Sequence, residues 1–171
     1  MSRRTVRAAI QTYLQGGLPG IVGLQRVYRA MPWFVDGVIA FNHVANLGNG
    51  AYAFINLTRS DETRKAVPAV QGIVSVHYDV TIVVCYQFLI PSAVIDPTIT
   101  EDEWVDACDD ILQGIKNRIH ADPNLGSPGT IFLAAQTPRT LTINSDDPRL
   151  ESGAVYSWHT IDFQVTEIIQ A

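Results

Sequence analysis

Cysteine is scarce in this chain of 171 residues. Cys85 and Cys108 are too few for a disulfide framework, and both are typical of small apolar residues in a core. The opening MSRRTVRAAI lacks the apolar segment of a signal peptide, and no apolar run is long enough for a membrane-spanning helix. We therefore expect a soluble protein, made in a reducing cytoplasm, that does not insert into a membrane.

Charge is also sparse, at 17% of residues, and the net charge of −5 argues against a general affinity for nucleic acid. The two signs are separated along the chain. Five arginines precede the first acid, Asp36, whereas the range 96–110 carries seven acids and no base. Hydrophobic residues make up 47%, which is enough for a sizeable core in one domain, residues 1–171.

Motifs of catalysis are missing as well. The four histidines form no HxxxH or carboxylate-paired spacing, no serine stands in a GxSxG elbow, and the GlyAsnGly at 48–50 is typical of a turn. Asp106, Asp109 and Asp110 could be read as a metal site, but the wet face of an amphipathic helix or a protein interface accounts for them better. We expect no catalytic residue, no cofactor and no metal.

The strongest pattern is the stretch Val74 to Ile90, in which every even position is apolar or tyrosine. This period of two predicts a β-strand with one buried face. The odd positions are polar up to Thr81 and mostly apolar beyond, so the second half is expected to be covered on both faces. Such a strand would span about 55 Å, against a domain diameter near 40 Å. It must therefore bend, or part of it projects as a hairpin arm that another molecule covers.

Two helices are expected. Apolar residues at three- and four-residue spacing predict the first, from Ser2 as N-cap to the break at Gly16. The second follows the capping box of Thr100 and Glu103. Its apolar stripe, widened by Val105 and Leu112, comprises Trp104, Cys108, Ile111, Ile115 and Ile119. We expect this stripe to pack on the even face of the long strand, near Val80, Ile82 and Val84.

Further strands are expected at 51–57, near 130–135, around 139–143 and in the closing AVYSWHTIDFQVTEII, the last beside the long strand. An extended stretch begins at Ile21, and residues 31–46 give no clear pattern. The segment TRSDETRKAVPAVQG is expected to be a mobile projecting loop or hairpin arm, about 58–73, that a neighbour orders. The prediction is an α+β fold, with a mostly antiparallel sheet, one long central strand and two helices packed on it.

This order of elements resembles the tail terminator proteins of long-tailed bacteriophages. The resemblance rests on VHYDVTIVV, followed after a proline-marked turn by EDEWVDACDDILQGIKNRI and at the end by WHTIDFQV, and on YAFINL before a charged segment. It covers most of the chain as a pattern of elements. It implies a sheet with helices on one face, and a hexameric ring that stops growth of the tail tube and joins the tail to the head.

The same resemblance implies a non-enzymatic virion protein, made in the host cytoplasm, whose partners are its own copies, the tail tube protein and a neck protein. DNA would pass through the ring without sequence-specific binding. We expect a head-to-tail contact between the basic N-terminal surface and the acidic helix. The interface candidates are Arg4, Arg7, Arg59, Asp61, Arg64, Lys65, Asp106 and Asp109. The alternatives are another neck or head-completion protein, a minor tube subunit and, less well supported, a small-molecule enzyme.

Overall fold

The computed structural model describes residues 3–16, 20–30, 34–35, 38–39, 50–65, 73–89, 101–126, 131–133, 140–151 and 154–170. Two helices and nine strands fall in these ranges. In chain order they are α1 (Arg3–Gly16), β1 (Leu24–Tyr28), β2 (Phe34–Val35), β3 (Val38–Ile39), β4 (Gly50–Lys65), β5 (Ile73–Leu89), α2 (Glu101–Ala121), β6 (Ile131–Leu133), β7 (Thr142–Ser145), β8 (Arg149–Glu151) and β9 (Ala154–Gln170).

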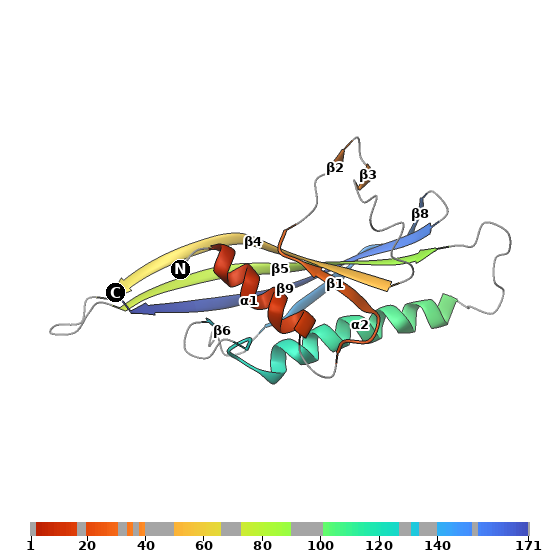
Figure 1. Ribbon diagram of the computed structural model, residues 1–171. Helices are drawn as coiled ribbons and strands as arrows, with labels where there is room; N and C mark the ends of the chain where they lie inside the picture. Colours follow the sequence, from red (N-terminus) through yellow and green to blue (C-terminus); the bar gives the residue numbers. More distant parts are fainter. Residues whose placement is uncertain are drawn as a thin grey trace.

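Three long strands form the centre of one sheet of seven described strands (Figure 1). β5 lies in the middle, antiparallel to β4 on one side and to β9 on the other. Short strands complete the edges, with β1 parallel to the start of β4, and β6, β7 and β8 antiparallel to successive parts of β9. The α+β class, the long central strand and the closing strand beside it are therefore confirmed.

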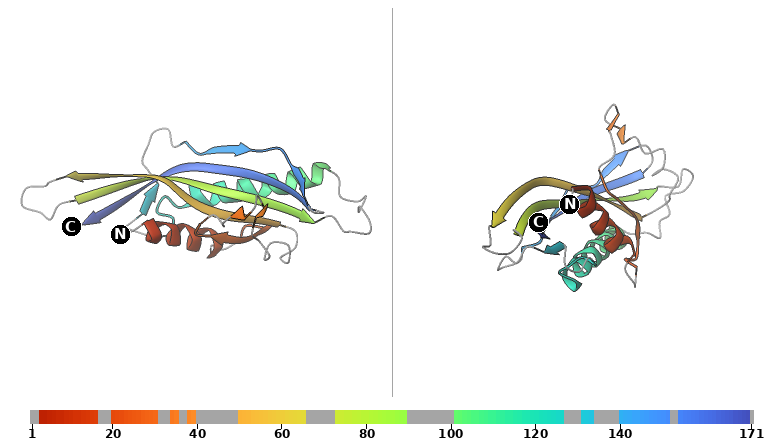
Figure 2. Two further views of the ribbon diagram at one scale, coloured as in Figure 1. Left: turned by 90° about the horizontal axis from the view of Figure 1, so that it is seen from above. Right: turned by 60° about the vertical axis from the view of Figure 1, so that its left-hand side comes forward.

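Both helices cover the same face of this sheet (Figures 1 and 2). One core cluster joins Ile10 of α1 and Ile111 and Ile115 of α2 to the even positions of β5, including Val80, Ile82 and Val84. The packing expected for Ile111 and Ile115 is confirmed. Trp104 is half-buried and lies against Tyr86, with ring centroids 5.6 Å apart. Val105 is 46% exposed, so including it in the buried stripe was wrong.

The opposite face of the sheet carries a second, aromatic cluster. Tyr52, Phe54 and Cys85 are buried there, and Tyr156 and Trp158 of β9 pack against them. The short antiparallel pair β2–β3 lies on this side (Figures 1 and 2). As the odd positions of the long strand indicated, its second half is covered on both faces, with Cys85 and Gln87 buried and His77 exposed.

The far ends of the long strands extend beyond both helices (Figures 1 and 2). We call this part the arm, comprising 58–65 of β4, 73–79 of β5 and 164–170 of β9, and the rest of the chain the body. Its β4 segment begins at an irregularity between Leu57 and Arg59, and pairs with β5 from Arg59↔Asp79 to Lys65↔Ile73. Of the two alternatives expected for about 58–73, a loop or a hairpin arm, residues 59–65 follow the hairpin arm, because their backbone forms a ladder with β5 within the subunit. Residues 66–72 lie outside the described residues.

Several predicted boundaries also shift. The strand at 51–57 is longer, at Gly50–Lys65, and the strand expected around 139–143 begins at Thr142. The polar segment after it contains β8. Ser2 and Thr100, the two expected N-caps, lie outside the described residues, as does most of 31–46. The ends of α1 and α2 otherwise agree with the expected helices.

Candidate subunit interfaces

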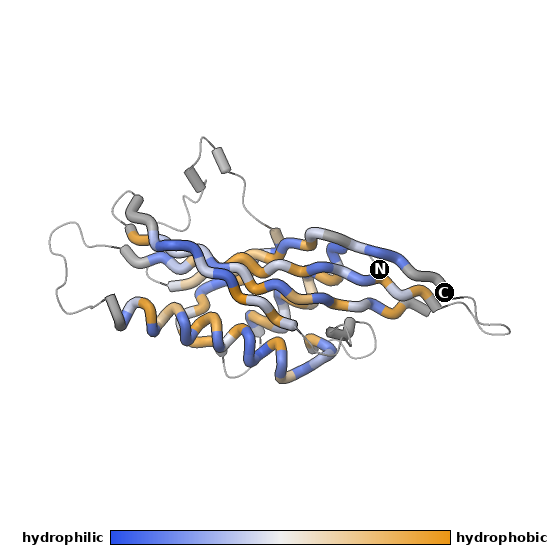
Figure 3. The backbone as a smooth tube through the Cα atoms, turned by 180° about the vertical axis from the view of Figure 1, so that it is seen from behind, coloured by the Kyte–Doolittle hydropathy of each residue, from blue (hydrophilic) through white to orange (hydrophobic). Residues whose placement is uncertain are grey.

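The outer face of the arm, turned away from the helices, carries polar side chains bonded across strands. Gln164 Nε2 donates to Asp79 Oδ1 at 2.7 Å, and His77 Nδ1 lies 2.9 Å from Thr166 Oγ1. Hydrophobic and hydrophilic positions alternate along the strands in the view from behind (Figure 3). Side-chain hydrogen bonds therefore join β5 and β9 on this face.

On the helix side, the arm meets the body at a buried polar pair. The Tyr78 hydroxyl donates to Glu167 Oε2 at 3.0 Å, and both side chains are buried. Burial, together with this hydrogen bond, raises the pKa of Tyr78 to about 12. Glu167 Oε1 is buried without a hydrogen-bond partner. The sequence analysis missed this pair, although Glu167 continues the alternation of Ile161, Phe163 and Val165 and so falls on the buried face.

The N-terminal arginines lie where α1 begins, next to the arm (Figures 1 and 2). Arg3 donates to the main-chain carbonyl of Leu57 at the base of the arm. Arg4 is exposed, and Arg7 is half-buried with its Nε lacking a hydrogen-bond partner. This end of α1 therefore presents positive charge beside the arm, and no acid lies in the helix's first turn to offset it.

The acidic patch lies at the other end of the sheet. We use this name for Glu103, Asp106, Asp109 and Asp110, all exposed in the first half of α2. α2 begins far from the arm and runs back toward it (Figures 1 and 2). The structure therefore does not bring Arg4 and Arg7 together with Asp106 and Asp109 within one subunit.

The other four interface candidates share the β4 segment of the arm. In the register with β5, Arg59 is opposite Asp79, Asp61 opposite His77, Arg64 opposite Val74 and Lys65 opposite Ile73. The Asp61 side chain is exposed. The arm and the first two turns of α1 thus place six of the eight candidates toward one end of the molecule, with the acidic patch at the other.

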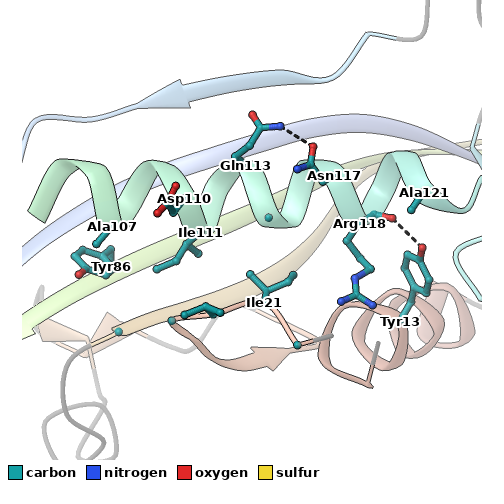
Figure 4. A pocket seen from close by; sticks show the side chains of 15 residues that line it. Tyr13, Ile21, Tyr86, Ala107, Asp110, Ile111, Gln113, Asn117, Arg118 and Ala121 are labelled. Carbon is teal, nitrogen blue, oxygen red and sulfur yellow. Dashed lines mark hydrogen bonds between the residues drawn. The ribbon is translucent and has the colours of Figure 1, made fainter. Parts of the chain in front are cut away.

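A groove of about 920 Å³ lies between α2, the segment 20–23 and Tyr13 of α1 (Figure 4). Ile21 and Ile111 line it, and Asp110 and Arg118 lie toward opposite ends of it along α2. The Tyr13 hydroxyl donates to the carbonyl of Arg118 at 2.8 Å, which fixes α1 against α2. Among the described residues that line the groove, the titratable side chains are Tyr13, Tyr86, Asp110 and Arg118. The hydrophobic periodicity of the sequence gave no sign of the groove.

A buried Cys–His contact is the arrangement nearest to catalytic chemistry. Cys108 Sγ lies 3.1 Å from His159 Nε2, which is also 2.8 Å from Ser157 Oγ, and His159 Nδ1 is 2.8 Å from Ser145 Oγ. Burial raises the pKa of Cys108 to about 11 and lowers the pKa of His159 below its usual value. A neutral imidazole beside a neutral thiol satisfies hydrogen bonds in the core, but it supplies no thiolate nucleophile at neutral pH.

The remaining candidates from the sequence are three histidines and Cys85. His77 and His120 are exposed, His43 lies outside the described residues, and Cys85 is a buried free thiol. Within the described ranges, no three His, Cys, Asp or Glu side chains are grouped so that they could hold a metal ion. None of the described helices is long and apolar enough to cross a membrane.

Comparison with known proteins gives no family for the chain. The sequence matches no protein-family model, and a search of curated proteins found no match.

Proposed function

We propose that this protein is a structural subunit of a phage virion, a tail terminator that forms a ring on the tail tube and joins it to the neck and head. The supporting observation is the arm, in which β4, β5 and β9 extend the sheet beyond both helices of the body (Figure 1). A projecting sheet end, whose outer β4 edge has no strand partner among the described residues, gives a subunit a large surface for contact with other subunits. The helices on one face of the sheet agree with the arrangement that the sequence resemblance implies.

In this proposal the ring is a homohexamer at the head–tail junction, and its partners are the tail tube protein and a neck protein. DNA passes through it without sequence-specific contacts, in keeping with the net charge of −5. The protein is not an enzyme. The buried Cys108–His159 contact and the groove beside α2 then have structural roles.

The subunits join head to tail, with the N-terminal arginines of one facing the acidic patch of the next. Because these two surfaces lie at different ends of one subunit, they fit a rotational contact that closes into a ring. Exposed ion pairs are worth only about 0–1 kcal/mol each, so the charges set orientation and apolar contact provides most of the affinity.

Charge reversal tests this contact. The variant Asp106→Lys with Asp109→Lys should assemble slowly or wrongly while keeping its circular dichroism spectrum. Adding Arg4→Glu and Arg7→Glu should partly restore rings, counted by electron microscopy and by mass in solution. Asp147→Lys, an exposed acid outside α2, is the control. Unchanged assembly of the acidic-patch variant at low salt, where charge effects are largest, would refute the contact.

The electron micrographs also distinguish the proposed terminator from the alternative functions. A closed ring of fixed size supports a terminator, whereas an open polymer supports a minor tube subunit, and a ring that binds the connector but not the tube supports another neck protein. A small-molecule enzyme would instead need a ligand in the groove beside α2, detectable as a thermal shift that Ile21→Trp abolishes.

A further inference from the structure

The outer edge of β4 continues well past its last described strand partner on that side. β1 pairs with β4 only from Ala51 to Phe54, whereas β4 runs on to Lys65. Within the described part of the chain, no strand pairs with the outer edge of residues 55–65. An extended edge of this kind can receive another strand through main-chain hydrogen bonds.

The residues on this edge have an unusual order of charge. Positions 61–65 read Asp, Glu, Thr, Arg, Lys, which is two acids, a neutral centre and two bases. If two copies of this segment pair antiparallel with Thr63 opposite Thr63, then position 61 lies opposite 65, and position 62 opposite 64. Every charge then faces one of opposite sign, and a two-fold axis passes through the Thr63 pair.

We propose that two copies of this protein associate through the outer edges of β4, antiparallel and centred on Thr63, so that their arms form one continuous sheet. The occupant of the edge is a second copy because the charge order is self-complementary. This contact is two-fold, and it is separate from the head-to-tail contact of the proposed ring. Neither depends on the other.

Charges on an exposed edge can also serve to keep other strands away. That role needs only like charges opposite each other, which any run of one sign provides. In the register centred on Thr63, the order found here instead places opposite charges across the two strands. Each such cross-strand pair favours pairing by about 0.2–1 kcal/mol. A protective edge and a pairing edge therefore give different results in a crosslinking experiment.

A single cysteine at the two-fold axis is the direct test. Directly opposed residues in an antiparallel pair have Cα atoms about 4.5–5.5 Å apart, within the range of about 4.4–6.8 Å that a disulfide requires. Thr63→Cys should therefore give a covalent dimer on mild oxidation. In Ser60→Cys the two cysteines would be about 20 Å apart along the strands, so this exposed control should not crosslink. The native thiols of Cys85 and Cys108 are buried and do not compete.

Charge variants in the Thr63→Cys background then test the reason for pairing. Asp61→Lys with Glu62→Lys gives an all-basic edge, and Arg64→Glu with Lys65→Glu gives an all-acidic one. Each alone should lose about tenfold or more in dimer yield, since four favourable pairs become repulsive. An equal mixture of the two should crosslink again, and so should the fourfold variant with all four charges reversed.

Several outcomes would overturn the proposal. They are no crosslink at position 63, equal crosslinking at 60 and 63, or single-sign edges that crosslink as well as the original. A head-to-tail ring does not bring residue 63 of two subunits together by symmetry. Rings without this crosslink would therefore refute only the two-fold contact, and the crosslink without rings would refute only the proposed function.

Discussion

Replacing Ile115 by Ala is the most direct test of the two-layer packing. Ile115 is fully buried in the core between α2 and the sheet. The substitution removes three buried carbon groups, worth about 2.4 kcal/mol at about 0.8 kcal/mol each, and it leaves a cavity that adds to the cost. Because β5 is paired on both sides, by β4 and β9, the sheet cannot easily move in to fill that cavity. We expect a loss of about 3–5 kcal/mol in unfolding free energy.

Urea unfolding followed by circular dichroism measures this loss as a lower midpoint at an unchanged slope. Val105→Ala is the matched control on the same helix, because Val105 is 46% exposed, and its effect should stay within about 0.5 kcal/mol. Ile111→Ala should fall between the two, since Ile111 also lines the groove. A loss below about 1 kcal/mol for Ile115→Ala, or equal losses for Ile115→Ala and Val105→Ala, would refute the packing.

Three further predictions concern titration and exchange. The pKa of Tyr78 is about 12 in the folded protein, against 10 in the unfolded chain. The contribution of Tyr78 to stability is therefore complete below pH 10 and is lost as the pH rises toward 12. Tyr78→Phe should weaken that loss in alkaline unfolding curves. Burial lowers the pKa of His159, so the free energy of unfolding should fall as the pH drops below about 6.5. A His159→Gln variant whose stability fell equally with pH would contradict this prediction. In the isolated subunit, amides of β5 should exchange slowly and those of 58–65 only partly so, because β5 is paired on both sides and the arm of β4 on one. Fast exchange throughout 58–65 would restore the loop interpretation.

The hydrophobic periodicity of the sequence predicted those helices and strands that have one buried face and one more exposed face. The even positions of β5 and the stripe of α2 face one another across the core, so burial imposed a period of two on the strand and a period near 3.6 on the helix. Both could be read without knowledge of the partner. Val105 shows the limit, because it lies two helical turns before Leu112 on the same side of α2, yet only Leu112 is covered.

The sequence could not decide between a loop and a hairpin arm for this part of β4, for a related reason. Residues 58–65 read TRSDETRK, and the side chains of Thr58, Ser60, Asp61 and Glu62 are all exposed. A segment without a buried face shows no alternation, and its strand conformation comes from pairing with β5. Composition alone therefore left both the loop and the hairpin arm open, and only the long-range register reveals the strand.

The candidate site was predictable only in part. The separation of positive and negative charge along the sequence persists in space, since the N-terminal arginines lie beside the arm and the acidic patch lies at the far end of the sheet. The contact between Cys108 and His159 was not predictable, because it joins α2 to β9 across 51 positions. Sequence spacing reports such a pair only when both residues lie on one element.

The effect of an arm variant on association can be separated from its effect on folding. The buried apolar residues of β4 end at Leu57, just before the arm, and those of β5 begin at Tyr78, near the base of the arm. The side chains of Asp61 and Glu62 are exposed, so substitutions there remove no side chain from the core, and the main-chain ladder of 61–65 to β5 does not depend on side-chain charge. Their effect on folding should stay near that of other surface changes, within about 0.5 kcal/mol. A charge variant of the arm that fails to associate but unfolds at the original urea midpoint has thus lost an interface, whereas a lowered midpoint would mean that the arm contributes to the fold of the body.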